Sequence, residues 1–256
     1  ALPILGLWFA APYLAYLLSK PAPTSRPELS DADRAYLRQL AERTWRHFET
    51  YVTAGDRWLP PDNVQFDPEP RIAHRTSPTN IAMTLLSTLA AYDLELIELP
   101  VLIDRLDATL TTVDRLEHFE GHLLNWYDTQ TLEPLLPKYV STVDSGNFAA
   151  ALLTVASGLR ATAGQQPEAA ARLEALAERA GANFEEMHFG FLFDRKGRLF
   201  AIGYRLGDAM GAARMDNAFY DLLASEARLA SFLAIAKGGV PEMHCFHLGR
   251  LVTSVR

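Results

Sequence analysis

The repeated helical spacing of apolar residues constrains the fold of this chain more than any other feature. In six segments, apolar side chains recur every three or four residues, which is the pattern of an amphipathic α-helix. Ser77 followed by Pro78 marks one helix start, because Ser caps a helix and Pro suits its first position. The expected helices cover residues 30–52, 77–92, 100–119, 145–163, 168–187 and 216–237.

The six expected helices form three pairs, with a long polar loop inside each pair and a short link between pairs. This alternation predicts an all-α fold of helical hairpins packed around an axis. A superhelical repeat array is the competing architecture, although no fixed sequence period is visible. One small β-hairpin is also expected, because residues 191–194 and 199–204 are strand-like and flank a turn that contains Gly197.

The composition is that of a globular protein whose main partner is not nucleic acid. The 256 residues are 49% hydrophobic and 21% charged, which fits one large domain or two small ones. The net charge of −7 argues against nucleic acid, since phosphate binding needs a basic surface. Cys245 is the only cysteine, which excludes a disulfide framework within the chain and fits a reducing compartment.

The first 18 residues are almost wholly apolar and carry Trp8, Tyr13 and Tyr16, which suit a membrane interface. The segment has no basic start, is shorter than the ~20 residues that span a bilayer, and contains Pro12. We therefore expect a membrane-proximal origin for this segment. The localisation expected for the chain is the inner (cytoplasmic) membrane, with the rest of the chain on the cytoplasmic side. The expected parts are a membrane-proximal segment at 1–19, a Pro-rich linker at 20–29 and a helical domain at 30–256.

Three loops, at residues 67–80, 125–147 and 204–220, collect side chains that suit sugar binding. They would project from the same end of the molecule if the helices alternate in direction. Aromatic rings beside paired polar groups fit a sugar, which offers an apolar C–H face and a rim of hydroxyls.

Each of these candidates also has a structural interpretation. Trp126, Tyr127 and Tyr139 could equally plug the core beneath a long connection. Asp144, Ser145 and Asp216 could each cap a helix, and for a single residue capping is favoured. The convergence of three such loops is what favours a site.

No metal or cofactor motif stands out. His118 and His122 resemble paired ligands, but Gly121 breaks the helix that would align them. His244 and His247 are too compact and isolated to form a zinc site. Neither a P-loop nor a Gly-x-Gly-x-x-Gly string occurs, so we expect no metal and no cofactor.

Glycoside chemistry needs two carboxyl groups, and the sequence offers several without singling out a pair. Glu226 lies in the middle of an expected helix, where a structural hydrogen bond or ion pair is its expected role. The remaining candidates are Asp128, Asp144, Asp208, Asp216, Glu117 and Glu120.

Four strings of the sequence resemble the glucoamylase-like domain of cyclic β-1,2-glucan synthases. They are RIAHRTSPTNI at 71–81, NWYDT at 125–129, YVSTVDSGN at 139–147 and DNAFYDLLASEARLASF at 216–232. The resemblance covers about residues 30 to 250 and implies an (α/α)6 toroid with a central pocket. It also implies a retaining transglycosylase that adjusts the length of linear β-1,2-glucan, while a separate region polymerises glucose from UDP-glucose.

The chain departs from the family pattern, because only three of the six helical hairpins are expected in it. The Glu-bearing catalytic loops of the family follow the segment that matches residues 248–250, so no catalytic residue carries over. The resemblance implies these substrate-binding candidates: Arg75, Asn80, Trp126, Tyr127, Asp128, Asp144, Asn147, Asp216, Asn217 and Tyr220.

The expected function is that of a carbohydrate-active domain, incomplete here, which binds and transglycosylates linear β-1,2-glucan by a retaining two-carboxylate mechanism. Expected partners are a β-glucan oligosaccharide, the remainder of a larger polypeptide or a second copy, and a membrane through residues 1–18. Exposed inner helices of half a toroid predict self-association or marginal stability. The alternatives are a glycoside hydrolase that uses Asp144 and Asp216, and a non-catalytic, membrane-attached helical module that binds glucan or protein.

Overall fold

The computed structural model describes residues 2–20, 28–209 and 211–250. Most of the linker expected at 20–29 and the tail at 251–256 therefore lie outside the described residues. The chain forms two units, residues 1–39 and residues 40–256, and each is described by itself.

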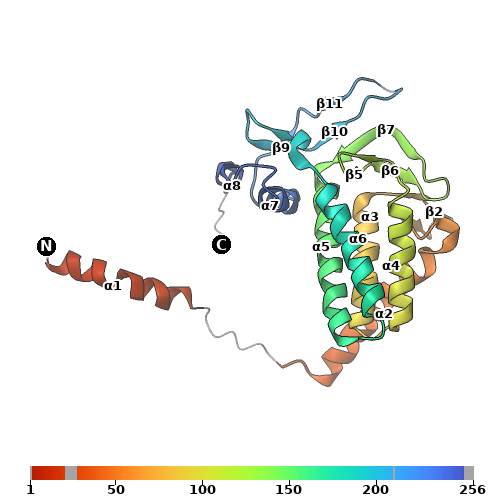
Figure 1. Ribbon diagram of the computed structural model, residues 1–256, viewed down its shortest axis with the longest axis horizontal. Coiled ribbons are helices and arrows are strands. Elements are labelled where there is room, and N and C mark those ends of the chain that lie inside the picture. Colours follow the sequence, from red (N-terminus) through yellow and green to blue (C-terminus); the bar gives the residue numbers. More distant parts are fainter. Residues whose placement is uncertain (1, 21–27, 210, 251–256) are drawn as a thin grey trace. The chain divides into compact units, whose positions relative to one another are not determined.

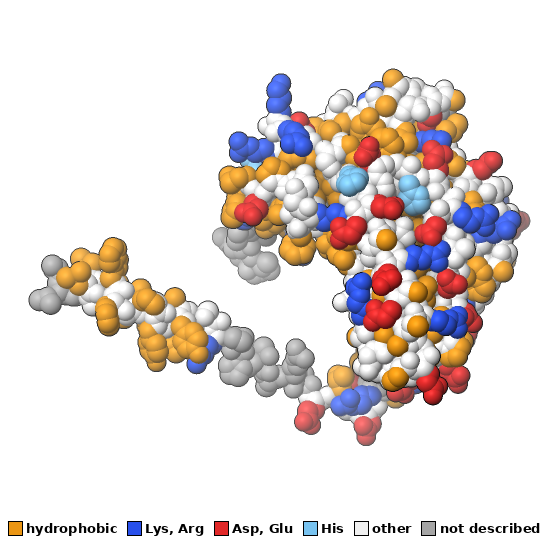
Figure 2. All heavy atoms as spheres, viewed as in Figure 1, with side chains coloured by type: hydrophobic (Ala, Val, Ile, Leu, Met, Phe, Trp, Pro, Cys, Tyr) orange, Lys and Arg blue, Asp and Glu red, His pale blue; other side chains and the backbone are white. Residues whose placement is uncertain are grey.

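The first unit contains α1 (Leu2–Ser19) and the start of α2 (Asp31–Tyr51). Exposed hydrophobic side chains line α1, with Trp8 78% and Phe9 91% exposed (Figure 2). No helix among the described residues has the length and apolarity needed to cross a bilayer. At the start of α2, the Ser30 hydroxyl accepts the Asp33 N–H and the Asp33 carboxylate accepts the Ser30 N–H, which together form a capping box.

Helix α5 (Thr142–Gln165) is the centre of the second unit. It packs against α3 (Pro78–Asp93), α6 (Ala170–Glu186) and α7 (Arg228–Ala236) (Figure 1). Helix α4 (Leu99–Val113) contacts both α3 and α6. The short helices are η1 (Ala54–Asp56), η2 (Phe189–Leu192) and α8 (Met243–His247).

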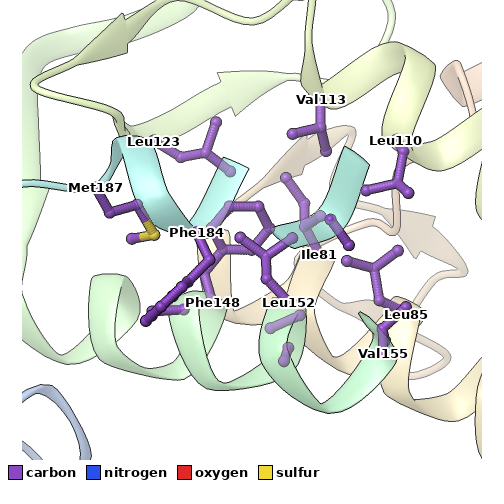
Figure 3. Packing of buried hydrophobic residues seen from close by; sticks show 14 of the residues in the cluster. Ile81, Leu85, Leu110, Val113, Leu123, Phe148, Leu152, Val155, Phe184 and Met187 are labelled. Carbon is purple, nitrogen blue, oxygen red and sulfur yellow. The ribbon is translucent and has the colours of Figure 1, made fainter. Parts of the chain in front are cut away.

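A continuous apolar core joins these helices. Ile81 of α3, Leu110 of α4, Phe148 and Leu152 of α5 and Phe184 of α6 all point into it (Figure 3). The surface over α4 and α6 carries mixed charges, including ion pairs in which Arg179 contacts Asp107 and Asp114 (Figure 2). The apolar stripes predicted from the sequence are thus the faces that pack together.

Helix α7 lies unusually close to the first turns of α5. A Cβ atom at Gly146 would lie only 2.6 Å from the backbone nitrogen of Ala230. Only glycine permits this crossing, which brings α7 next to the N-terminal end of α5.

The expectation of a single β-hairpin is wrong, although the helical character of the fold is confirmed. The described residues contain four small sheets, because the long loops pair their backbone groups instead of leaving them to solvent. The strands are β1 (Val64–Gln65), β2 (Arg71–Ile72), β3 (Arg75–Thr76), β4 (His118–Phe119), β5 (His122–Leu123), β6 (Asn125–Asp128), β7 (Pro134–Ser141), β8 (Phe193–Asp194), β9 (Leu199–Ala201), β10 (Gly203–Arg205), β11 (Arg214–Met215) and β12 (Phe219–Tyr220).

The helix expected at 216–237 is also wrong over its first half, since α7 begins only at Arg228. The Asp216 N–H donates to Gly203, and Tyr220 pairs with Phe200, so these backbone groups belong to sheets. Long-range pairing has overridden a helical sequence pattern, which a local pattern cannot reveal.

Candidate active site

The five-stranded sheet unites all three loops singled out in the sequence. Its strand order is β11-β10-β7-β6-β3, so β3 comes from the first loop, β6 and β7 from the second, and β10 and β11 from the third (Figure 1). Within it Arg75 lies opposite Asp128, and Tyr139 lies between Asn125 and Arg205. The structure thus pairs strands that are 49 residues apart, from Thr76 to Asn125, and 62 residues apart, from Ser141 to Gly203.

Trp126 of β6 is partly exposed beside a fixed cation. The Arg75 guanidinium lies 5.4 Å from the Trp126 ring centroid. Asp62 holds that guanidinium by accepting from Nε at 3.1 Å and from Nη2 at 2.8 Å. A guanidinium over an indole fixes the ring and leaves its remaining exposed surface for a ligand.

The N-terminal ends of α3 and α5 meet next to this sheet. The Asp144 carboxylate, in the first turn of α5, accepts the Thr79 N–H of α3 at 3.3 Å. Asn147 donates to the Thr79 hydroxyl at 3.0 Å. A carboxylate beside helix N-termini is stabilised by their free N–H groups and dipoles. Asn80 is half-buried on α3, and its Nδ2 atom has no hydrogen-bond partner among the described residues.

Ser141, rather than Ser145 or Asp144, caps α5, because its side chain accepts the Asp144 N–H. The Asp144 carboxylate therefore does not cap α5, and it instead accepts an N–H in the first turn of α3.

Asp216 is held by Tyr139. The Tyr139 hydroxyl donates to the Asp216 carboxylate, and burial together with this bond raises the pKa of Tyr139. The hydroxyl therefore stays protonated and remains a donor at neutral pH. Asp216 is not at a helix start, so its capping interpretation does not apply.

Glu226 belongs to the same group, although the sequence suggests only a structural hydrogen bond or ion pair for it. Its carboxylate accepts from the Tyr220 hydroxyl at 3.0 Å. Burial first, and then the bond to Glu226, raise the pKa of Tyr220 to about 12, and the charge of Asp144 acts in the same direction. Glu226 is exposed in the turn before α7, so its expected mid-helix position is wrong, whereas its bond to Tyr220 is a hydrogen bond of the kind expected for it.

Three of the ten expected substrate-binding residues do not belong to the group around Asp144 and Asp216. Tyr127 is fully buried, with its hydroxyl donating to the Glu117 carbonyl at 2.5 Å and accepting from the Leu124 N–H at 2.7 Å. This placement matches the core-plug interpretation. The Asp128 carboxylate accepts the Gln130 and Thr131 N–H groups and shapes the β6–β7 turn. Asn217 is exposed beside Asp216.

The resulting group, which we call the mouth, consists of Arg75, Asn80, Trp126, Tyr139, Asp144, Asn147, Asp216, Tyr220 and Glu226. It offers an aromatic surface, amide and hydroxyl groups, and carboxylates fixed by protonated tyrosines. Such a set can stack on a sugar, bond its hydroxyls and place carboxylates near a glycosidic bond. Among the described residues, no cluster of His, Cys, Asp and Glu could hold a metal ion.

No family model matches the chain. Cyclic β-(1,2)-glucan synthase NdvB of Rhizobium meliloti (strain 1021) is 32% identical over 373 residues, covering 99% of this chain and 13% of the synthase. The aligned stretch is longer than the 256-residue chain, so the synthase has residues within it that lack a counterpart here.

Two solved structures share the fold. The endo-β-1,2-glucanase of Talaromyces funiculosus in complex with β-1,2-glucan has a TM-score of 0.67 at 11% identity, covering 84% of this chain and 49% of that chain. The endo-β-1,2-glucanase of Chitinophaga pinensis in complex with sophorotriose and glucose has a TM-score of 0.61 at 14% identity, covering 86% and 50%. This chain therefore spans about half the length of each enzyme.

The resemblance drawn from the four sequence strings is thus confirmed. The chain is homologous, over nearly its whole length, to a segment of a cyclic β-1,2-glucan synthase, and its fold is shared with endo-β-1,2-glucanases.

Proposed function

We propose that this chain holds linear β-1,2-glucan at the mouth, as the substrate-binding part of a retaining transglycosylase domain within an (α/α)6 toroid. The observation that carries the proposal is the five-stranded sheet, which gathers Trp126, Tyr139 and the neighbouring carboxylates from three distant loops. The homologous synthase and the glucanases that share the fold support β-1,2-glucan as the sugar.

In this proposal each kind of side chain has one task. The exposed surface of Trp126 stacks against the C–H face of a glucose unit, while Arg75 holds the ring from its other side. Asn147 and the Asp144 carboxylate bond sugar hydroxyls at the ends of α3 and α5. Arg75 and Asn80 stay candidates for hydroxyl contacts.

Retention needs two carboxyl groups about 5–5.5 Å apart on opposite sides of the scissile bond. One carboxylate attacks C1 of a glucose unit while a carboxylic acid gives its proton to the leaving oxygen. The hydroxyl of another glucan end then displaces the carboxylate and returns a proton to the second group. We expect the chain to supply binding surface, with an acid and a nucleophile contributed from outside these 256 residues.

A glycoside hydrolase acting through carboxylates of this chain is the second candidate. The observation in its favour is that two carboxylates at the mouth, Asp216 and Glu226, are each oriented by a tyrosine hydroxyl. Hydrolysis would differ from transfer in letting water, and not a sugar hydroxyl, complete the reaction.

Product sizes separate these functions. The purified chain would be incubated with linear β-1,2-glucan of defined length, and the products followed by mass spectrometry, with binding measured in parallel by calorimetry. Our proposal predicts binding without a change in glucan length. Lengthened and shortened chains together would place both catalytic carboxyls in this chain, shortened chains alone would favour the hydrolase, and no binding would contradict the proposal.

A further inference from the structure

A pocket of about 500 Å³ lies beside α7, outside the group of residues that sequence reasoning selected. Its lining is mostly apolar and includes Leu229, Phe232 and Ile235 of α7. Its rim carries Glu226 and Arg228, and Cys245 of α8 also lines it. The volume falls within the ~300–1,000 Å³ that is typical of sites for small organic ligands.

The pocket adjoins the mouth through Glu226. The same carboxylate that lines the pocket accepts the Tyr220 hydroxyl at 3.0 Å, and the charge of Asp144 acts on that tyrosine. The close crossing at Gly146 and Ala230 brings α7 beside the first turn of α5, where Asp144 lies. The pocket therefore lies next to Tyr220 at the edge of the mouth.

The chemistry of the pocket fits a pyranose ring. The Phe232 side chain is 67% exposed, so its ring offers a flat apolar surface. Glu226 accepts hydrogen bonds and Arg228 donates them, so together they can bond adjacent hydroxyls of one sugar. Hydrophobic side chains gather over α7 and α8 on the surface as well (Figure 2).

We propose that this pocket is a further subsite, which binds a glucose unit of the same β-1,2-glucan chain beyond the units held at the mouth. The inference rests on the proposed function, and it adds a second binding place for the same glucan. It makes affinity depend on glucan length, because only a chain long enough to reach from Trp126 to Phe232 gains the additional contact.

Cys245 provides a direct test of occupancy. It is the only cysteine of the chain, it is half-buried, and it lines the pocket. The rate of its reaction with a thiol reagent such as DTNB would be measured with β-1,2-glucan oligosaccharides of increasing length. Bound sugar should slow the reaction at least fivefold once the oligosaccharide reaches the pocket, and shorter oligosaccharides should bind without slowing it.

Phe232→Ala supplies the second readout. We expect it to lower affinity for long oligosaccharides about tenfold, to leave affinity for short ones unchanged, and to remove the protection of Cys245. Phe66→Ala is the matched control, since Phe66 is exposed to a similar degree, 70%, and does not line the pocket. The measurements would be made at several protein concentrations.

The outcomes separate the two proposals. Failure of the unaltered chain to bind any glucan would overturn the proposed function. Binding at the mouth with an unchanged Cys245 rate, or an equal effect of Phe232→Ala on short and long glucans, would overturn the subsite alone. Protection of Cys245 that follows protein concentration and not glucan would mean that a second copy of the chain covers the pocket, which also overturns the subsite.

Discussion

At the scale of single residues, the mouth depends on a close approach between two strands. A Cβ atom at Gly203 would lie 2.2 Å from the Tyr139 hydroxyl oxygen and 2.4 Å from the Val140 carbonyl oxygen. Gly203 therefore lets the Tyr139 ring reach Asp216 across β10.

We predict that Gly203→Ala displaces Tyr139, weakens glucan binding and destabilises the fold by about 1–3 kcal/mol. Calorimetry and denaturant unfolding would measure both effects. Gly190→Ala is the control, because no heavy atom lies within 4 Å of a Cβ built at Gly190. Equal behaviour of the two variants would show that the approach does not matter.

His122 is a second residue with a measurable effect, because its burial makes the stability of the fold depend on pH. It is fully buried against Phe189 and Phe191, and neither ring nitrogen has a hydrogen-bond partner among the described residues. Burial lowers the pKa of His122 to about 3, so the imidazole stays neutral in the folded protein.

Because this pKa is lowered by folding, the contribution of His122 to stability is complete above pH ~6.5 and is lost as the pH falls toward 3. Between pH 7 and pH 5 we predict a loss of about 2 kcal/mol in the free energy of unfolding, from about 1.36 kcal/mol per pKa unit. His122→Phe should remove this part of the pH dependence in urea titrations. The prediction fails if the two proteins lose stability in parallel.

At the scale of elements, Arg105 of α4 closes the C-terminal end of α2. Its Nη2 donates to the Phe48 carbonyl at 2.9 Å and to the Val52 carbonyl at 3.1 Å. The guanidinium also lies 5.1 Å from the Trp45 ring and 5.5 Å from the Trp58 ring.

Replacement of Arg105 by Met should keep the aliphatic packing but remove the donor to the Val52 carbonyl, and it should leave the Phe48 carbonyl with only the Val52 N–H. We expect a loss of about 2–4 kcal/mol in the free energy of unfolding, from the hydrogen bonds and the cation–π contacts together. Chemical denaturation would measure it, with Arg115→Met as a control for loss of charge on a neighbouring exposed arginine. Equal losses in the two variants would refute the assigned role.

The elements that could be predicted from the sequence are those with local signals. The helix starts at Ser77 and Ser30 and the four long helices α3 to α6 follow from apolar spacing and capping. The end expected at residue 119 is wrong, because α4 ends at Val113 and His118–Phe119 form β4. The segment from 216 to 227 could not be predicted, because its pairing partners lie in β9, β10 and at Gly249. Local spacing carries no information about such partners.

The same difference between local signals and long-range pairing explains which site residues the sequence could not identify. Aromatic and amide residues in loops 67–80 and 125–147 could be selected because the loops are unusual in composition. Glu226 could not, since its sequence neighbours suggest a helix and its partner Tyr220 is fixed by pairing with Phe200. Tyr127 is a binding candidate through the family resemblance, whereas its burial supports the alternative that it packs in the core.

At the scale of the whole molecule, the function rests on how the described parts of residues 40–256 combine. Packing between α3 and α5 places their N-terminal ends together, and the loops between the helices form one sheet next to these ends. The membrane association expected from residues 1–18 and the expected self-association stay predictions.

Binding of linear β-1,2-glucan to the unaltered chain and to Trp126→Ala, followed by calorimetry, tests the central claim most directly. Trp8→Ala is the matched control, since Trp8 is an exposed tryptophan on α1. We predict that Trp126→Ala raises the dissociation constant about tenfold, or about 1.4 kcal/mol, while Trp8→Ala leaves it unchanged. Equal affinity in all three proteins would contradict the account, because the glucan would then not lie at the mouth.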